Sequence, residues 1–323
     1  MNTGLRITVF AAALAATFGT AYGVGSGIGR VSPTTESAAH GAHGAQEAHG
    51  AHEGTGHASA APPGGLQISE GGYTLDLKTP AVEPGKTTDL RFRVVRDSTG
   101  RALTDYQQEH TKELHLIIAS RDLTLFRHLH PTRAADGTWS TPVNLPKAGT
   151  YRVFADFTPR GGEGLTLGAD LTASGMYEPA RLPVPAATTE VDGYEVGLRG
   201  SLAPDRAGEL TLSVTRNGRP VRDLQPYLGA YGHLVALRSG DLAYLHVHPA
   251  GAPGDGRTEA GPDITFTATA PSAGTYRLFL DFKHEGAVHT AAFTVRAGRT
   301  GTHQQASGAA SAPAPEEHSG HAH

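Results

Sequence analysis

An internal repeat constrains this chain more than any other feature of its sequence. The segment Gly100–His130 matches Gly218–His248 at a constant offset of 118 residues and without a gap. Further along, AGTYRVFADF at 148–157 matches AGTYRLFLDF at 273–282 in eight of ten positions. We therefore expect two copies of one domain, and the 323 residues leave room for both copies and for tails.

Each copy has the pattern of a small all-β domain. Short runs of alternating apolar and polar residues are separated by Gly, Pro and Asp, and no helical period intervenes. The predicted strands of the first copy are 73–78, 88–95, 113–119, 124–130, 138–145, 150–157 and 165–172. About seven strands in about 100 residues are typical of an immunoglobulin-like sandwich, and Gly-Thr-Tyr at 149–151 and 274–276 resembles its tyrosine corner. The predicted fold class is all-β, with two tandem immunoglobulin-like or cupredoxin-like β-sandwich domains.

Histidine-rich segments of low complexity flank the two copies. They consist mainly of Gly, Ala, Glu and His, and so few apolar residues cannot bury a core, which predicts disorder. The predicted organisation is an N-terminal segment at 1–29, a His-rich linker at 30–64, a first sandwich at 65–177, a Pro-rich linker at 178–187, a second sandwich at 188–297 and a His-rich tail at 298–323.

The N-terminal segment has the pattern of an export signal. Residues 7–29 carry no charge and lie between Arg6 and Arg30, as in a secretory signal peptide. The run also approaches the ~20 residues that a membrane span needs. Whether the segment is cleaved or kept as an anchor stays open. In both cases we expect the rest of the chain outside the cytoplasm, with membrane contact only through this segment.

Composition excludes several classes of function. The chain has no cysteine, which excludes disulfides and thiolate metal sites, and its two methionines cannot form a methionine-rich copper(I) site. The net charge of −4 gives no basic excess, so no nucleic-acid partner is expected. No nucleophile triad, paired carboxylates or phosphate-binding loop is recognisable, and we therefore do not expect an enzyme.

Histidines at matching positions of the two copies are the candidate chemical groups. Both copies carry three histidines separated by 13 and then 2 residues. Residues two apart in a strand share a face, and directly opposed residues lie ~5 Å apart. Two-residue hairpin loops at Arg121–Asp122 and Ser239–Gly240 would therefore set the first histidine of each copy opposite the second. The sequence thus predicts that each hairpin gathers three imidazoles, His115, His128 and His130 in the first copy and His233, His246 and His248 in the second.

Carboxylates and two further histidines are expected at the same end of each sandwich. Strands C and F run antiparallel in such a fold, so Asp156 should lie beside His115 and Asp281 beside His233. Each carboxylate would be a fourth ligand or would orient a ligating ring. His-only sites favour copper(II), with zinc(II) as the other candidate. The candidate metal residues are His115, His128, His130, Asp156, His233, His246, His248, Asp281, His284 and His289.

The outward face of the same hairpins is apolar. It carries Ile117, Phe126, Val235, Leu237, Leu242 and Tyr244. An exposed apolar sheet face usually meets a partner. We therefore expect the two sandwiches to pack through these faces, which would bring their histidine clusters together.

The segments HLIIASRDLTLFRHLHP, YLGAYGHLVALRSGDLAYLHVHP and AGTYRxFxDF carry a family resemblance. The whole chain resembles a group of secreted actinobacterial proteins with His-rich flanks and duplicated β-domains. The hairpin is similar to that of bacterial extracytoplasmic modules that end a strand in HxHP. The resemblance implies export and a role near the handling of heavy metals, above all copper, but no particular activity.

Two functional hypotheses remain. The first is an extracytoplasmic protein that binds a transition metal, with copper favoured, as a buffer, scavenger or chaperone. The alternative is a non-metal interaction module, whose partner is another cell-envelope protein and whose histidines are structural groups at the interface between the domains.

Overall fold

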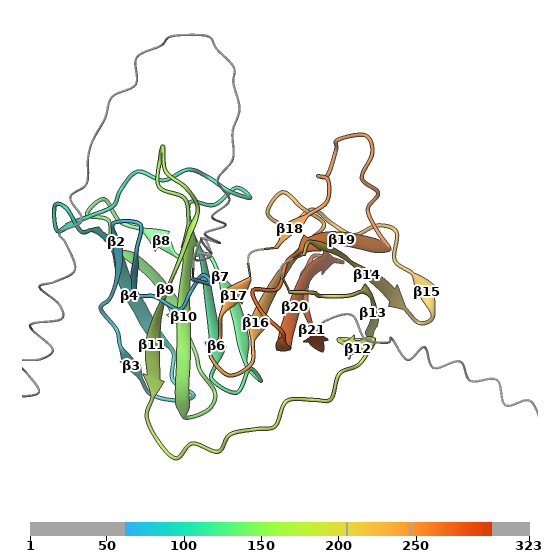
Figure 1. Ribbon diagram of the computed structural model, residues 1–323, viewed down its shortest axis with the longest axis horizontal. Helices are drawn as coiled ribbons and strands as arrows, with labels where there is room; N and C mark the ends of the chain where they lie inside the picture. Colours follow the sequence, from blue (N-terminus) through green and yellow to red (C-terminus); the bar gives the residue numbers. More distant parts are fainter. Residues whose placement is uncertain (1–61, 205, 246, 299–323) are drawn as a thin grey trace, which may run out of the picture. The chain divides into compact units, whose positions relative to one another are not determined.

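The computed structural model describes residues 62–204, 206–245 and 247–298 (Figure 1). Within these ranges every regular element is a β-strand, which confirms the predicted fold class. The described part of the chain also contains no helix long and apolar enough to cross a membrane. The predictions for the N-terminal segment and for nearly all of the His-rich flanks concern residues outside these ranges.

The first sandwich consists of two sheets. One has the order β1 (Ser69–Glu70), β2 (Tyr73–Leu77), β4 (Thr88–Arg96), β9 (Trp139–Val143) and β8 (Thr132–Arg133), with β5 (Arg101–Ala102) paired to β4. The other has the order β3 (Ala81–Val82), β11 (Leu165–Ala173), β10 (Gly149–Phe157), β6 (His115–Ser120) and β7 (Phe126–Leu129). This arrangement matches the A-B-E-D and G-F-C sheets of an immunoglobulin-like domain, with an added strand after C.

The second sandwich repeats this topology, except that its described strands include no counterpart of β3. One sheet has the order β12 (Thr188–Val191), β13 (Tyr194–Gly200), β14 (Gly208–Arg216), β19 (Asp263–Ala268) and β18 (His248–Pro249), with β15 (Arg219–Pro220) paired to β14. The other has the order β17 (Tyr244–Leu245), β16 (Gly232–Arg238), β20 (Gly274–His284) and β21 (Ala287–Ala297). The tyrosine corner is confirmed in both copies, because Tyr151 donates to the Lys147 carbonyl (2.7 Å) and Tyr276 to the Ser272 carbonyl (2.8 Å).

Alternation along β6 gives this strand two buried faces. Leu116 and Ile118 point into the core of the first sandwich, where they pack with residues of both of its sheets. Ile117 and Ala119 point the other way, yet they are fully buried as well. A strand whose outward face is dry must be covered by something outside its own sandwich.

The second sandwich covers that face. A separate apolar cluster, here called the interface cluster, joins the outward faces of the two hairpins. Its buried members are Ile117, Ala119, Leu123, Phe126, Phe154, Val235, Leu237, Leu242, Tyr244 and Phe279. All six residues of the predicted apolar face belong to it, and the expectation that the sandwiches pack through these hairpins is confirmed.

The contacts within the interface cluster are related by the repeat. Phe126 stacks on Phe279 with ring centroids 4.2 Å apart, and Tyr244 packs on Phe154 at 5.6 Å. Phe126 and Tyr244 occupy equivalent positions of the two copies, and so do Phe154 and Phe279. Each copy therefore offers the same patch to the other, as subunits do in a twofold dimer.

The predicted hairpin loops are wrong by two residues. Ser120 N donates to the Leu125 carbonyl and Arg238 N to the Ala243 carbonyl, so each loop has four residues. His128 consequently lies opposite Ile117, not opposite His115. A shift of two residues keeps every side chain on its face, and the predicted gathering of the histidines survives.

Burial of leucine explains the longer loops. Leu123 and Leu242 adopt left-handed backbone conformations, with φ of 56° and 64°, and both side chains are buried in the interface cluster. Such a conformation costs a non-glycine residue about 1–2 kcal/mol. Full burial of a leucine side chain stabilises the fold by about 1.5–3 kcal/mol, so packing against the other sandwich outweighs the local backbone strain.

Candidate metal centre

Three histidines of the first copy lie together at one end of the hairpin. His115 opens β6, His128 lies on β7, and His130 follows the end of β7. One ring nitrogen of each lies within 4.8 Å of those of the other two. The predicted cluster of the first copy is therefore confirmed as an arrangement of side chains, and these three residues are called the triad below.

The spacing of the triad rings fits a shared ion. The ring centroids are 5.3 Å apart for His115 and His128, 5.2 Å for His115 and His130, and 4.8 Å for His128 and His130. Imidazoles on a tetrahedral ion, with metal–nitrogen distances of ~2.0 Å, have centroids roughly 5 Å apart.

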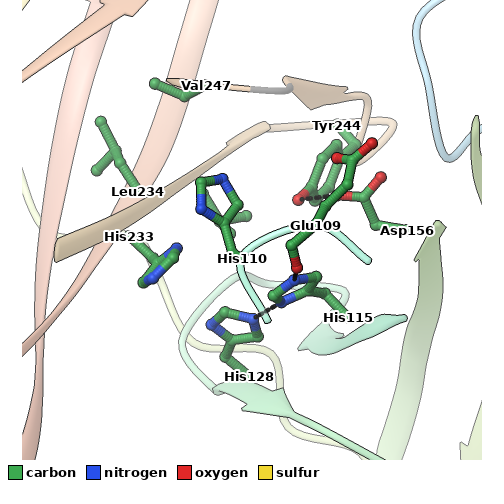
Figure 2. A pocket seen from close by; sticks show the side chains of 10 residues that line it. Glu109, His110, His115, His128, Asp156, His233, Leu234, Tyr244 and Val247 are labelled. Atoms are coloured by element: carbon green, nitrogen blue, oxygen red, sulfur yellow. Dashed lines mark hydrogen bonds between the residues drawn. The ribbon is translucent and has the colours of Figure 1, made fainter. Parts of the chain in front are cut away.

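Hydrogen bonds require a proton on one ring nitrogen of His115 and on one ring nitrogen of His128. His115 Nε2 lies 3.1 Å from the Glu109 carbonyl, and His128 Nδ1 lies 2.9 Å from Asp281 Oδ2. A carbonyl and a carboxylate only accept, so both of these nitrogens must donate. The remaining nitrogens, His115 Nδ1 and His128 Nε2, face each other at 3.0 Å (Figure 2). In neutral rings these are two lone pairs with no hydrogen between them, so the contact needs a bridging cation, either a proton on one of the two nitrogens or a metal ion.

The third member of the triad has an unsatisfied nitrogen. His130 Nε2 is buried and has no hydrogen-bond partner in the structure. An unpaired buried polar atom costs about 1–3 kcal/mol. Burial, with the neighbouring His128, lowers the pKa of His130 to about 3 and that of His115 to about 4. Protonation of His115 or His130 is thus unfavourable, and three imidazole nitrogens are a ligand set that zinc(II) and copper(II) accept.

The second sandwich reaches into the same site. Asp281, which is 3% exposed, accepts from His128 of the first copy and from Thr290 Oγ1 (2.6 Å). The predicted pairings of Asp281 with His233 and of Asp156 with His115 are both confirmed by strand register. The contact of Asp281 with the first copy was not predicted, because it depends on how the sandwiches pack. Asp156 in turn accepts from Thr166 (3.0 Å) and from Tyr244 of the second sandwich (3.3 Å).

Besides the triad and His233, the structure describes the side chains of only two of the predicted histidines, His284 and His289. His246 lies outside the described residues, and of His248 only the backbone is described, which pairs with Thr267 of the opposite sheet. The side chains of His284 and His289 both point to the inner face of the second sandwich, where they pack against the core residue Tyr194. His284 Nε2 donates to Asp223 (3.1 Å) and its Nδ1 accepts from the Tyr194 hydroxyl (2.7 Å). His289 Nδ1 donates to Asp192 (2.8 Å).

A small cavity adjoins the triad, and sequence reasoning missed one histidine in its wall. The cavity has a volume of about 40 Å³, enough for an ion and one or two waters. It is lined by Glu109, His110, His115, His128, Asp156, His233, Leu234, Val235, Tyr244 and Val247 (Figure 2). His110 escaped notice because it precedes the matched histidines and its equivalent in the second copy is Leu228.

The metal-free protein should lose stability in acid. Burial lowers the folded-state pKa of His115 and of His233 to about 4, from an ordinary value of 6.5. Between these values the unfolded chain binds more protons, so the free energy of unfolding should fall as pH drops from 6.5 to 4. Each residue should contribute about 3 kcal/mol when fully titrated. Urea unfolding with a chelator at pH 7, 6, 5 and 4.5 measures this, and a flat profile would show that these rings are not buried as neutral groups.

Solved structures of bacterial proteins, an adhesin among them, match the chain at low identity. The Escherichia coli adhesin FdeC is 16% identical with a TM-score of 0.24, and the match covers 70% of this chain and 65% of that one. A protein from Corynebacterium diphtheriae described as membrane-anchored is 11% identical, with a TM-score of 0.22 and coverages of 71% and 60%. Yersinia pseudotuberculosis InvD is 16% identical, with a TM-score of 0.23 and coverages of 71% and 58%. This chain thus spans less than two thirds of their length, and the matches say nothing about the histidine site.

A family model gives a clearer result. No curated protein matches the sequence. The model of a domain of unknown function, DUF8832, matches residues 67–175 and 189–299, one match over each sandwich. Together the two matches cover more than half of the chain. The chain therefore belongs to the DUF8832 family and carries two tandem copies of its domain.

Proposed function

We propose that this protein binds a transition metal ion, copper(II) or zinc(II), at the triad, between its two sandwiches and outside the cytoplasm. The observation that carries the proposal is the convergence of three ring nitrogens, with His115 Nδ1 3.0 Å from His128 Nε2 and with both bearing lone pairs when the rings are neutral. A divalent ion could bind the lone pairs of His115 Nδ1 and His128 Nε2. It could also bind His130 Nε2, which has no hydrogen-bond partner, to give three metal–nitrogen bonds.

Each residue of the site has a distinct role in this proposal. The three triad nitrogens are the ligands, and a fourth position stays open to water or a partner's ligand. The Glu109 carbonyl and Asp281 hold the rings of His115 and His128 in the required tautomers, as outer hydrogen-bond partners do in many metal sites. The metal is cargo, and we expect no catalytic turnover.

Copper(II) is the favoured cargo among divalent ions. Sites of nitrogen ligands follow the order in which copper(II) binds more tightly than zinc(II). A protein with such a site would act as a buffer, scavenger or chaperone, and the nine histidines of the flanks would add weaker capacity. Export by the uncharged N-terminal segment is part of this proposal, because it places the site where copper(II) is not reduced by cytosolic thiols.

The test is a titration of the full chain with the flanks silenced. All nine flank histidines are replaced by asparagine, and this parent is compared with its His115→Ala/His128→Ala derivative by calorimetry with copper(II) and zinc(II). We expect stoichiometric binding by the parent and at least a 100-fold loss of affinity in the derivative. Equal affinities in the two proteins would refute binding at the triad.

Asp281 should matter for metal affinity although it is not a ligand. In Asp281→Asn, the amide can present either N–H or C=O to His128 Nδ1, so the tautomer that exposes Nε2 is no longer fixed. Loss of such a partner typically costs 10–100-fold in metal affinity. We expect a loss in this range by calorimetry. Asp192→Asn, which alters the partner of His289 away from the triad, should bind metal like the parent.

The second candidate function is a non-metal interaction module of the cell envelope. It is favoured by the interface cluster and by the bond from His128 to Asp281, which make histidines part of a packed domain interface. In this case added metal would leave the melting temperature unchanged. A rise in the melting temperature that depends on the triad would favour the metal-binding function instead.

A further inference from the structure

We propose a second metal ion in the cavity next to the triad, held by His110 of the first sandwich and His233 of the second. This inference rests on the proposed function of the triad and extends it to a two-ion site that links the sandwiches. The two rings lie edge to face with centroids 5.0 Å apart, within the range expected for two imidazoles on one ion.

His233 is prepared for ligation in the same way as His115. Its Nε2 lies 2.8 Å from the Tyr227 carbonyl and must donate to it. Tyr227 is the repeat equivalent of Glu109, whose carbonyl receives His115 Nε2. Both copies therefore use one backbone carbonyl to hold the ring in the tautomer that leaves Nδ1 with a lone pair.

The backbone at His110 belongs to the fold, whereas its side chain is particular to the first copy. His110 has a φ of 50°, and its equivalent Leu228 has a φ of 51°. The turn around each is closed by the same bridge, Glu109 with Lys112 and Tyr227 with Ala230. The left-handed turn thus does not require histidine. An imidazole at this position in one copy, facing His233 of the other, has a chemical use that leucine lacks.

The cavity wall also contains carboxylates, because Glu109 and Asp156 line the same space as His110 and His233 (Figure 2). Among the described residues only the triad brings three ligand atoms within 4.8 Å of one another, so water would complete the ligand set of an ion held by these two histidines. His233 lies 6.1 and 6.3 Å from His128 and His115, measured between ring centroids. These distances exceed those within the triad, so His233 fits a neighbouring ion better than the triad ion.

The experiment counts ions per chain. The flank-silenced full chain, its His110→Leu variant and its His130→Leu variant are loaded with zinc(II) and weighed by native mass spectrometry. Leucine is the residue that the second copy carries in this turn, so His110→Leu should fold normally, which thermal melting with a chelator checks. We expect two ions in the parent and one in each variant. With copper(II), the parent should show the half-field paramagnetic resonance signal of two close ions, and both variants should lack it.

The outcomes separate the two proposals. One ion in the parent, retained in His110→Leu and lost in His130→Leu, would overturn the second site and leave the triad site standing. No bound ion in the parent would overturn both. Two ions in His110→Leu would show that the second ion is bound elsewhere, which also overturns this assignment.

Discussion

Replacing His130 by leucine should abolish the stabilisation of the protein by metal at the triad while leaving the metal-free protein at least as stable as before. The two effects are expected together because His130 Nε2 has no partner in the structure. Leucine removes a buried polar atom that costs about 1–3 kcal/mol when unpaired, and it keeps much of the apolar volume. With the parent, metal at 1,000 times its dissociation constant should add about 4 kcal/mol to the free energy of unfolding.

The measurement is urea unfolding of parent and variant, with a chelator and with copper(II) or zinc(II), on the flank-silenced full chain. The contribution of the triad ion should disappear in His130→Leu, and any residual metal effect should be that of the second ion. The opposite pattern is expected for His284→Asn. His284 is satisfied by Tyr194 and Asp223, so its replacement should weaken the metal-free protein and leave metal binding intact.

This pair of variants discriminates a ligand from a structural histidine. If His130 serves only the interface, His130→Leu should resemble His284→Asn and lose stability without metal. A full metal-induced stabilisation in His130→Leu would exclude this residue from the site altogether.

Strand periodicity explains why so much of the site could be predicted from the sequence. Alternation decides which face a residue occupies, and a hairpin register shifted by two residues leaves that face unchanged. His115, His128 and His130 therefore gather as predicted, although the predicted loops are two residues too short. The same periodicity separates His284 from the triad, since it lies an odd number of residues from the outward-facing Asp281. The odd spacing within the strand indicates this separation, whereas a shared position near the strand end does not.

Other features of the site depend on packing between the sandwiches, which no local pattern encodes. The loop length reflects the burial of Leu123 and Leu242 against the opposite sandwich. Asp281 accepts a hydrogen bond from His128, 153 residues away in the sequence, and the rings of His110 and His233 pack across the same interface. The apolar faces indicated that the two copies meet, but the residues that meet could not be read from one copy alone.

Phe279→Ala should both loosen the sandwiches and weaken metal binding. Phe279 is 3% exposed, stacks on Phe126 of the other sandwich and belongs to the interface cluster rather than to either sandwich core. Truncation of a buried phenylalanine typically costs about 3–5 kcal/mol, here taken mostly from the contact between the domains. Calorimetric melting should therefore change from one cooperative transition to two.

Metal affinity should fall at least 10-fold in Phe279→Ala, although Phe279 is not itself a proposed ligand. Asp281 lies two residues further along β20, and when the sandwiches separate it leaves His128, while His233 leaves His110. The matched control is Phe293→Ala, a truncation of equal size inside the core of the second sandwich, where Phe293 is 1% exposed. It should lower the melting temperature of that sandwich but preserve metal affinity at temperatures where the protein is folded. A site assembled from both domains cannot survive their separation. Two separate melting transitions with unchanged metal affinity in Phe279→Ala would therefore mean that the first sandwich binds the ion alone, without Asp281.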